Sequence, residues 1–304
     1  MNRSADTPNA DQDITVKKLP TKERLTRILS FMRGNIKLVI GSVLLLIIVF
    51  VAIFAPFIAP YTYNEMGTSA TLMEAPSAEH WFGTDNFGRD VFSRIVYGAR
   101  ISLTVAVVSV LVSTLIGIPL GLIAGYTGGW FDTLVMRISD IIMTIPTVLM
   151  AVTVTAVIGT GLKVVIVALS IVYIPGSARL ARSMVYSIKE REYVAAAKVI
   201  GEPKRRILWQ YIFPNCIAPI IVQCTLRLSS AVLSEAAISY LGYGTQAPMP
   251  SWGLMLSYCQ GLMWQSPIQV LYPGLAILIL VLAGNLFGDG MRDLLDPRFN
   301  GRFV

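Results

Sequence analysis

The chain has 304 residues, of which 54% are hydrophobic and only 14% are charged. Soluble globular proteins carry about 25% charged residues, so this composition excludes an ordinary water-soluble fold. The net charge of +7 would indicate nucleic-acid binding only if the basic residues gathered on one soluble face, and no segment is long and polar enough to form one.

Long uncharged runs predict membrane-spanning helices. The first, Leu38 to Ala55, follows an N-terminal segment of residues 1–37, and its 18 residues contain no ionisable group. At about 1.5 Å per residue such a helix crosses about 27 Å, close to the hydrocarbon thickness of a bilayer. After a loop of residues 56–102, the core of residues 103–287 contains five further spans, and residues 288–304 form a tail. These spans are Leu103–Gly125, Leu134–Ile158, Leu162–Ile174 with a continuation toward Ala181, Cys216–Ala237 and Ile268–Phe287.

Small residues and proline interrupt the predicted spans. The second span contains Gly117, Pro119 and Gly121. Such residues are tolerated in membranes where helices pack closely, so they favour a helix bundle over isolated anchors.

Basic residues predict the orientation of the spans. Residues 1–37 contain eight Lys or Arg, residues 176–215 contain eight and the tail after Phe287 contains three, which makes 19 against four in the alternate loops. Because basic loops stay in the cytoplasm, this asymmetry places both termini and the 176–215 loop there.

The most informative segment is the charged stretch Glu192–Asn215, part of a loop of residues 189–215. Its apolar residues recur at helical spacing and predict one face of a short helix: Tyr193, Ala196, Ala197 and Ile200. Gly201 and Pro203 end that helix, and a basic run begins at Lys204. The alternative interpretation is an ordinary interfacial helix between two spans.

This segment resembles the coupling loop of ABC-importer permeases, E-A-A-x3-G-x9-I-x-L-P, which docks onto a cytoplasmic ATPase. The matching positions are Ala196, Ala197, Gly201 and Pro214, and the departures are Ala195, Tyr211 and Phe213. Ala195 stands where the family has Glu, so the resemblance does not carry over the salt bridge to the ATPase that this Glu implies. The resemblance assigns ATPase coupling to Tyr193, Ala196, Ala197, Ile200, Gly201 and Pro214, with Gly201 allowing close approach.

Four more segments resemble the peptide-permease branch of these importers, the dipeptide and oligopeptide type "C" subunit. They are Phe54–Tyr61 followed by His80–Leu103, Gly125–Asp140, Ser239–Leu256 and Gly288–Arg298.

In the His80–Leu103 block, glycines allow tight turns, and we expect Asp85 and Asp90 to cap a helix or pair with Arg89 and Arg94. Phe92, Ile95 and Val96 predict an amphipathic helix on the outer surface. This segment either only anchors that surface or contacts a substrate-binding protein.

Charged residues inside or beside spans need partners. We expect an ion pair between Arg137 and Asp140, three residues apart, and pairing among Asp289, Arg292 and Asp293 in the tail. Arg227 lies in mid-span and shares a helix face with Glu235, two turns on. These two are the candidate pathway residues, Arg227 for a substrate carboxylate. The alternative for Arg227 is a partner on a neighbouring helix, or snorkelling.

The chain lacks the residues of an ATPase or a metal enzyme. There is no G-x-x-x-x-G-K-[ST] phosphate loop. The single histidine, His80, and the three cysteines have no metal-ligand spacing, and a Ser-His-Asp triad would have to use His80. We therefore expect no catalytic residue, metal or cofactor.

The resemblance implies an all-α membrane protein with the six-helix bundle of a type I ABC importer permease and a cytoplasmic coupling helix. It also implies a bacterial inner-membrane location, a second homologous permease, two cytoplasmic ATPases and an external substrate-binding protein. Di- or oligopeptides are the favoured cargo, with nickel or metallophore complexes, glutathione and oligosaccharides as alternatives. A stand-alone channel or secondary transporter, and a membrane receptor or scaffold, are the rival classes.

Overall fold

The computed structural model describes residues 35–68, 72–261, 263–264 and 266–295. Most of the predicted N-terminal segment and the last part of the tail lie outside these residues. The elements are α2 Ile36–Ile53, α3 Ala55–Ile58, α4 Val91–Thr127, α5 Gly129–Thr144, α6 Thr147–Ile158, α7 Leu162–Ile188, α8 Glu192–Val199, α9 Lys204–Arg206, the π-helix η2 Ile207–Ile212, α10 Phe213–Tyr240, α11 Trp252–Gln260 and α12 Pro267–Leu295.

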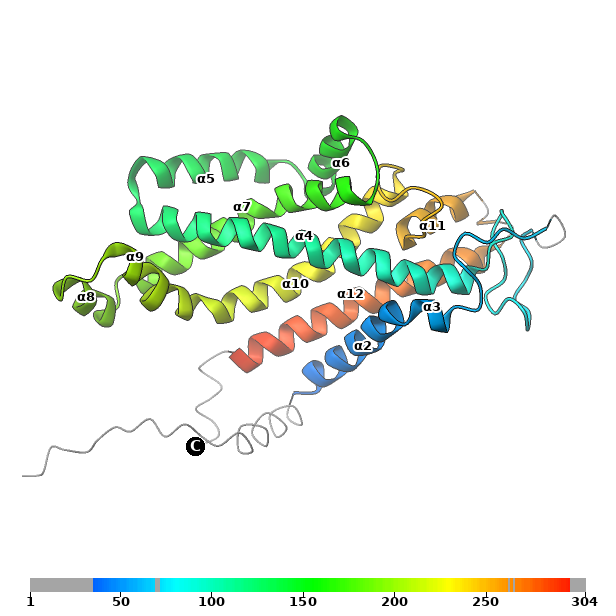
Figure 1. Cartoon of the computed structure of the whole chain (residues 1–304), viewed down its shortest axis with the longest axis horizontal. Helices are drawn as coiled ribbons and strands as arrows, with labels where there is room; N and C mark the ends of the chain where they lie inside the picture. The colour runs from blue at the N-terminus through cyan, green and yellow to red at the C-terminus, as the bar shows by residue number, and fades with distance from the viewer. Residues whose placement is uncertain (1–34, 69–71, 262, 265, 296–304) are drawn as a thin grey trace, which may run out of the picture.

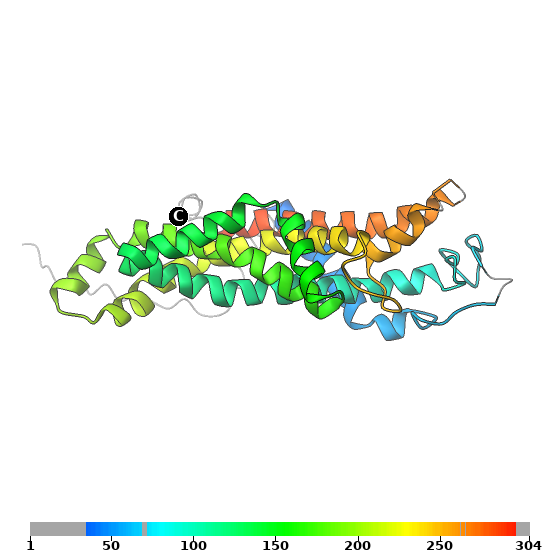
Figure 2. The same ribbon diagram turned by 90° about the horizontal axis from the view of Figure 1, so that it is seen from above.

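The long helices run side by side in an elongated bundle (Figures 1 and 2). Five helices of the described part are long and apolar enough to cross a membrane: α2, α4, α7, the continuous helix Lys204–Tyr240 and α12. The bent pair α5–α6 gives a sixth span if it is counted as one. The predicted all-α membrane bundle is therefore confirmed. One end of the bundle holds α8 and α9, here named the α8 end, and the opposite end holds α11 and residues 60–68 and 72–90 (Figure 1).

Helices α4 and α7 pack at close range through small residues. A Cβ atom on Gly121 would lie 2.0 Å from the carbonyl oxygen of Ala178, and one on Gly117 would lie 2.6 Å from the Cβ of Ser177. Gly125, one turn further, faces Val185 and Arg182 in the same way. The three glycines are four residues apart, so one glycine face of α4 lets the two backbones touch, as small residues do in membrane bundles.

The outer amphipathic helix predicted separately from the second span is the first part of α4. The side chain of Asp90 caps α4, accepting a hydrogen bond from the Ser93 amide at 2.7 Å, and the helix runs unbroken to Thr127. Of the predicted outer face, Val96 is buried and Phe92 and Ile95 are half-buried, so this face packs into the bundle. No proline separates the two expected elements, and Gly98 between them stays helical, so they fold as one.

The third span, predicted as a straight run over Leu134–Ile158, is instead broken into α5 and α6, which meet at 94°. The break falls at Ile145 and Pro146. Proline has no N–H for a helical hydrogen bond and disfavours the helical conformation in the residue before it, and Ile145 is indeed extended.

Helices α2 and α12 form a second close pair (Figure 1). Hypothetical Cβ atoms on Gly41 and Gly290 would lie 2.4 Å and 2.6 Å from the backbone of the partner helix. Asn35 Nδ2 donates to Asp293 Oδ2 at 3.2 Å. The pairing expected within the tail is therefore wrong for Asp293, whose partner lies on another helix, and Arg292 forms no ion pair within the described residues.

The packing of α4 on α7 predicts that Gly121→Ala lowers the stability of the protein. The added methyl group meets a backbone atom that cannot rotate away, and overpacking of this kind costs about 1–3 kcal/mol. Thermal unfolding in detergent should show a lower midpoint for this variant. Gly274→Ala is the matched control, because Gly274 is also helical and a Cβ there meets nothing within 4 Å. Equal midpoints for the two variants would contradict the tight contact.

Candidate functional site

Helix α8 ends in a hydrogen-bonded reversal at the α8 end of the bundle. The Gly201 amide donates to the Lys198 carbonyl oxygen and the Glu202 amide to that of Ala197, both at 3.1 Å. These are the two bonds of the Schellman motif, in which the residue just after the end of the helix adopts a left-handed conformation. Gly201 supplies it with φ +85°. Pro203 follows as the N-cap of α9, so the helix–turn–helix shape predicted from the sequence is present.

The two faces of α8 have different surroundings. Val194 and Ala197 are 0% and 3% exposed and pack into a hydrophobic cluster at the α8 end, which also contains Ile207 and Leu208 of η2. The same cluster includes Leu122 of α4 and Val185 and Ile188 of α7. α8 is therefore seated mainly on η2, and the cluster continues from there to α4 and α7.

The opposite face of α8 is free. Ile200 is 80% exposed and Val199 is 88% exposed, and Tyr193 and Ala196 are exposed as well. The sequence prediction placed Tyr193, Ala196, Ala197 and Ile200 on one face, but Ala197 points into the chain, away from the others. It missed Val194, although Val194 lies three residues before Ala197 and therefore shares its helix face.

Gly201 and Pro214 both determine backbone geometry. A Cβ on Gly201 would meet nothing within 4 Å, so within this chain the glycine is needed for its positive φ rather than for space. Pro214 cannot donate the α-helical hydrogen bond to Gln210, and the turn before it is π-helical, with Phe213 N bonded to Leu208 O. Lys204–Tyr240 remains one continuous helix, which joins the region of α8 to the span α10.

Two ion pairs hold α5 against α7. Asp132 accepts hydrogen bonds from Arg182 Nε at 2.5 Å and Nη2 at 2.6 Å, and from the Tyr186 hydroxyl at 3.0 Å. Asp140 pairs with Arg179 at 2.5 Å. The predicted pair Arg137–Asp140 is wrong, because the basic residue that faces Asp140 comes from α7. Sequence spacing within α5 gave no sign of it.

The opposite end of the bundle contains a buried charged network, as expected. Asp85 binds Arg89 through Nε at 2.7 Å and lies 3.7 Å from Arg94 Nε, and Arg94 Nη1 donates to the Tyr63 carbonyl oxygen at 2.7 Å. Asp90 Oδ1 lies 3.0 Å from His80 Nδ1. The prediction that Asp85 and Asp90 cap or pair is confirmed. His80 is held in this network.

The two predicted pathway residues lie in different surroundings. Glu235 is fully buried, and its two oxygens accept from Ser102 Oγ at 3.0 Å and Ser239 Oγ at 2.7 Å. It joins α10 to α4 and has no free face. Arg227 is half-buried, and its Nη1 donates to the Tyr173 carbonyl oxygen at 2.6 Å and to Ser177 Oγ at 3.1 Å. The structure does not bring Arg227 and Glu235 together.

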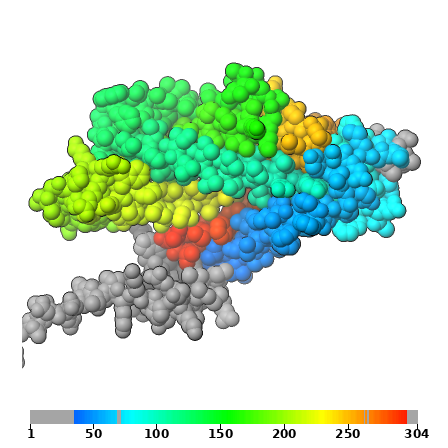
Figure 3. Space-filling model, in the orientation of Figure 1, coloured from blue at the N-terminus to red at the C-terminus, as the bar shows by residue number. Residues whose placement is uncertain are grey.

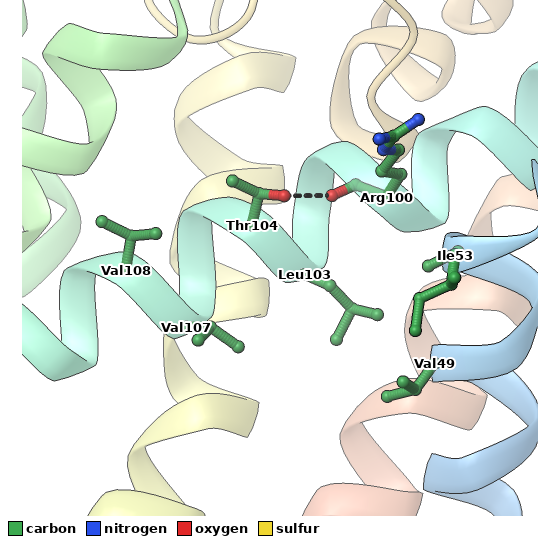
Figure 4. A pocket seen from close by; sticks show the side chains of 8 residues that line it. Val49, Ile53, Arg100, Leu103, Thr104, Val107 and Val108 are labelled. Carbon is green, nitrogen blue, oxygen red and sulfur yellow. Dashed lines mark hydrogen bonds between the residues drawn. The ribbon is translucent and has the colours of Figure 1, made fainter.

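A groove of about 410 Å³ lies between α2 and α4 (Figure 4). Its lining is aliphatic apart from Arg100 and Thr104, and the Thr104 hydroxyl donates to the Arg100 carbonyl oxygen at 2.7 Å. Binding sites for polar molecules contain several convergent polar groups. This groove offers only Arg100 and Thr104, and the Thr104 hydroxyl is used within α4, so we do not assign cargo to it.

Comparison with known families identifies the class of protein. Residues 117–301 match the family described as the binding-protein-dependent transport system inner membrane component, and residues 33–76 match the N-terminal TM domain of oligopeptide transport permease C. The chain belongs to this permease family. It is a multi-pass inner membrane protein.

Individual relatives extend this assignment over most of the chain. The dipeptide transport system permease protein DppC of Alkalihalophilus pseudofirmus is 46% identical over 267 residues, covering 88% of each chain. The glutathione transport system permease protein GsiD of Pectobacterium atrosepticum is 41% identical over 88% of this chain and 89% of its own. The di/tripeptide transport system permease protein DppC of Pseudomonas aeruginosa is 42% identical over 85% of this chain and 87% of its own.

A solved structure supports the fold. The permease resembles a chain of the MetNI methionine ABC transporter in inward-facing conformations, with a TM-score of 0.56 and 20% identity. The match covers 67% of this permease and 96% of that chain. The predicted ABC-importer permease fold is confirmed.

The backbone of the reversal after α8 predicts a specific effect of substitution. Gly201→Ala should destabilise this turn by about 1–2 kcal/mol, because a left-handed conformation is strained for a residue with a Cβ. Amide hydrogen exchange in α8 should then become faster. Gly201→Asn should be milder, since asparagine tolerates this conformation.

The control for this prediction is Gly242→Ala. Gly242 has the same φ of +85° and the same open surroundings, but it follows α10 at the other end of the bundle. It should leave exchange in α8 unchanged. Unchanged exchange in α8 with Gly201→Ala would refute the role assigned to Gly201.

Proposed function

We propose that this permease forms half of the translocation path of an ATP-driven importer for di- and oligopeptides, and that α8 couples this path to cytoplasmic ATPases. The observation that carries the proposal is the division of α8 into two faces. Val194 and Ala197 fix one face to η2 and to the cluster that η2 shares with α4 and α7, while Tyr193, Ala196 and Ile200 are left exposed. A helix held in this way can receive a force from a partner and pass it to the bundle.

The partners follow from what the chain lacks and from its family. It has no phosphate-binding loop, so ATP hydrolysis belongs to two separate cytoplasmic subunits that receive the exposed face of α8. A second homologous permease supplies the other half of the path. An external substrate-binding protein delivers the cargo, in keeping with the name of the family.

The proposed orientation places both termini and α8 in the cytoplasm. The excess of Lys and Arg in residues 1–37 and 176–215 supports it. The structure adds that Arg89 and Arg94, two basic residues of the opposite end, are buried beside Asp85. Little free positive charge therefore remains at the end proposed to be external.

The transport step is alternating access. ATP binding brings the two ATPases together and moves α8, and the continuous helix Lys204–Tyr240 with α4 and α7 tilts along with it. The path then opens to the external binding protein. A stand-alone channel or secondary transporter would not need an exposed face on α8, nor would a receptor or scaffold.

The names of the relatives favour peptides as cargo. Two of those described above are permeases for dipeptides or di- and tripeptides. Glutathione is the second candidate, because the GsiD relative aligns over a similar share of the chain. Glutathione is itself a tripeptide, so one kind of path suits both. Nickel or metallophore complexes and oligosaccharides were alternatives from sequence alone, and no relative described above favours them.

The deciding experiment is purification of the tagged permease from its native host in mild detergent, with identification of its partners. A second permease and P-loop ATPases are expected, followed by ATP-dependent uptake of a labelled dipeptide after reconstitution with the binding protein. Competition with glutathione separates the two cargoes. A lone chain that transports in vesicles without ATP would overturn the proposal.

The exposed face of α8 predicts that Ile200→Asp weakens ATPase binding without unfolding the permease. A carboxylate replaces an apolar side chain that is 80% exposed in the chain but buried in the proposed contact. We expect at least about tenfold weaker binding, equivalent to about 1.4 kcal/mol, with a normal amount of permease in the membrane. Titration of the purified ATPase against the permease measures this.

Two further variants make the result specific. Met66→Asp changes a residue with similar exposure, 67%, at the opposite end and should bind ATPase normally. Val194→Asp places a charge in the buried cluster and should lower the amount of folded protein instead. ATPase binding by Ile200→Asp equal to that of Met66→Asp would rule out coupling through α8.

A further inference from the structure

A stripe of polar side chains runs along α10 through the middle of its span. Gln223, Arg227 and Ser230 are spaced four and three residues apart, so they share one face of the helix. Ser230 is exposed, and Gln223 and Arg227 are half-buried. Polar and charged side chains at this depth avoid lipid and face a water-filled cavity or another protein group. This face therefore needs a polar neighbour outside the described chain.

Arg227 is only partly satisfied by its own chain. Both hydrogen bonds of Arg227 come from Nη1, which donates to the Tyr173 carbonyl oxygen and to Ser177 Oγ. The guanidinium carbon lies 5.7 Å from the centre of the Tyr173 ring. Among the described residues, Nε and Nη2 have no hydrogen-bond partner. Gly176 leaves the room for this packing, since a Cβ there would lie 2.1 Å from Nη2.

No carboxylate neutralises Arg227 within the part of the chain that the structure describes. The ion pairs formed there use other basic groups. Glu235, the acid on the same helix, is held by Ser102 and Ser239. A positive charge thus stands in mid-span with its remaining donors free.

We propose that the face formed by Gln223, Arg227 and Ser230 lines the translocation path and that Arg227 binds the carboxylate of a passing peptide. The inference rests on the proposed function and adds a binding residue to it. A guanidinium offers parallel N–H groups that match a carboxylate, and every unmodified peptide has one at its C-terminus. Gln223 and Ser230 can hydrogen-bond the amide groups of the peptide, whatever its side chains are.

The other source of a carboxylate is an acidic residue of the second permease. That contact would be structural and permanent, whereas a cargo contact forms only during transport. The amide and hydroxyl groups beside Arg227 favour cargo, because an ion pair between subunits does not need them. The experiment separates the two.

The test compares Arg227→Gln with Arg227→Lys in the complete transporter, containing both permeases, the ATPases and the binding protein. Uptake of a labelled dipeptide is measured at saturating binding protein. Because the variant loses the charge-assisted hydrogen bond to the carboxylate, uptake by Arg227→Gln should fall at least about tenfold. Arg227→Lys should keep part of the activity. Arg100→Gln, which removes an exposed arginine from α4 outside this face, should transport normally.

Each outcome decides between the explanations. Near-normal uptake by Arg227→Gln overturns this inference alone, whereas a wild-type complex that takes up no peptide overturns the proposed function and the inference with it. If Arg227→Gln fails to assemble, and neutralising an acid of the second permease restores assembly, Arg227 is a structural partner and the inference is wrong.

A second measurement does not depend on changing Arg227. Ser230→Cys in the assembled transporter should react with a charged, water-borne thiol reagent, and transported dipeptide should slow the reaction. The wild-type chain reports the background from its own cysteines, Cys216, Cys224 and Cys259. Reaction only with a lipid-borne reagent would show that this face points to lipid, which overturns the inference.

Discussion

The close contact between α4 and α7 is the interaction on which the rest of the structure depends. Membrane helices gain little from burying apolar surface against one another, because lipid is equally apolar, so they need close packing instead. The glycine face of α4 provides it against Ala178 and Ser177. The space-filling view shows the helices packed into one elongated body (Figure 3). Arg227 then docks on α7 beside the same Ser177.

The α8 end is built on this pair of helices. Leu122 of α4 and Val185 of α7 extend their contact into the cluster that receives Val194 and Ala197. A short helix of eight residues is not stable alone in water, so its position comes from this packing and from the reversal at Gly201. Rigid seating on one side and exposure on the other are what a coupling element requires.

The charged residues of the bundle differ in whether their own chain supplies an oppositely charged partner. Several are paired within the chain: Asp85 with Arg89, Asp132 with Arg182, and Asp140 with Arg179. Such pairs hold elements together and leave no charge for a ligand. Arg227 is different, since the described part of its own chain supplies only neutral acceptors. In a transporter this difference separates a charge used for folding from one available to cargo.

The sequence alone determined the membrane class, the approximate positions of the long apolar helices and the helix–turn–helix that begins at Glu192, because each depends on local properties: hydropathy, the lack of charge, and helix-breaking glycine and proline. Tertiary structure alone decided which face of α8 is buried, that Asp140 pairs with Arg179 rather than Arg137, and that Glu235 is enclosed by serines. These outcomes join residues from different helices. Spacing along one helix describes which side chains share a face, but the partner of that face is set by how distant helices pack.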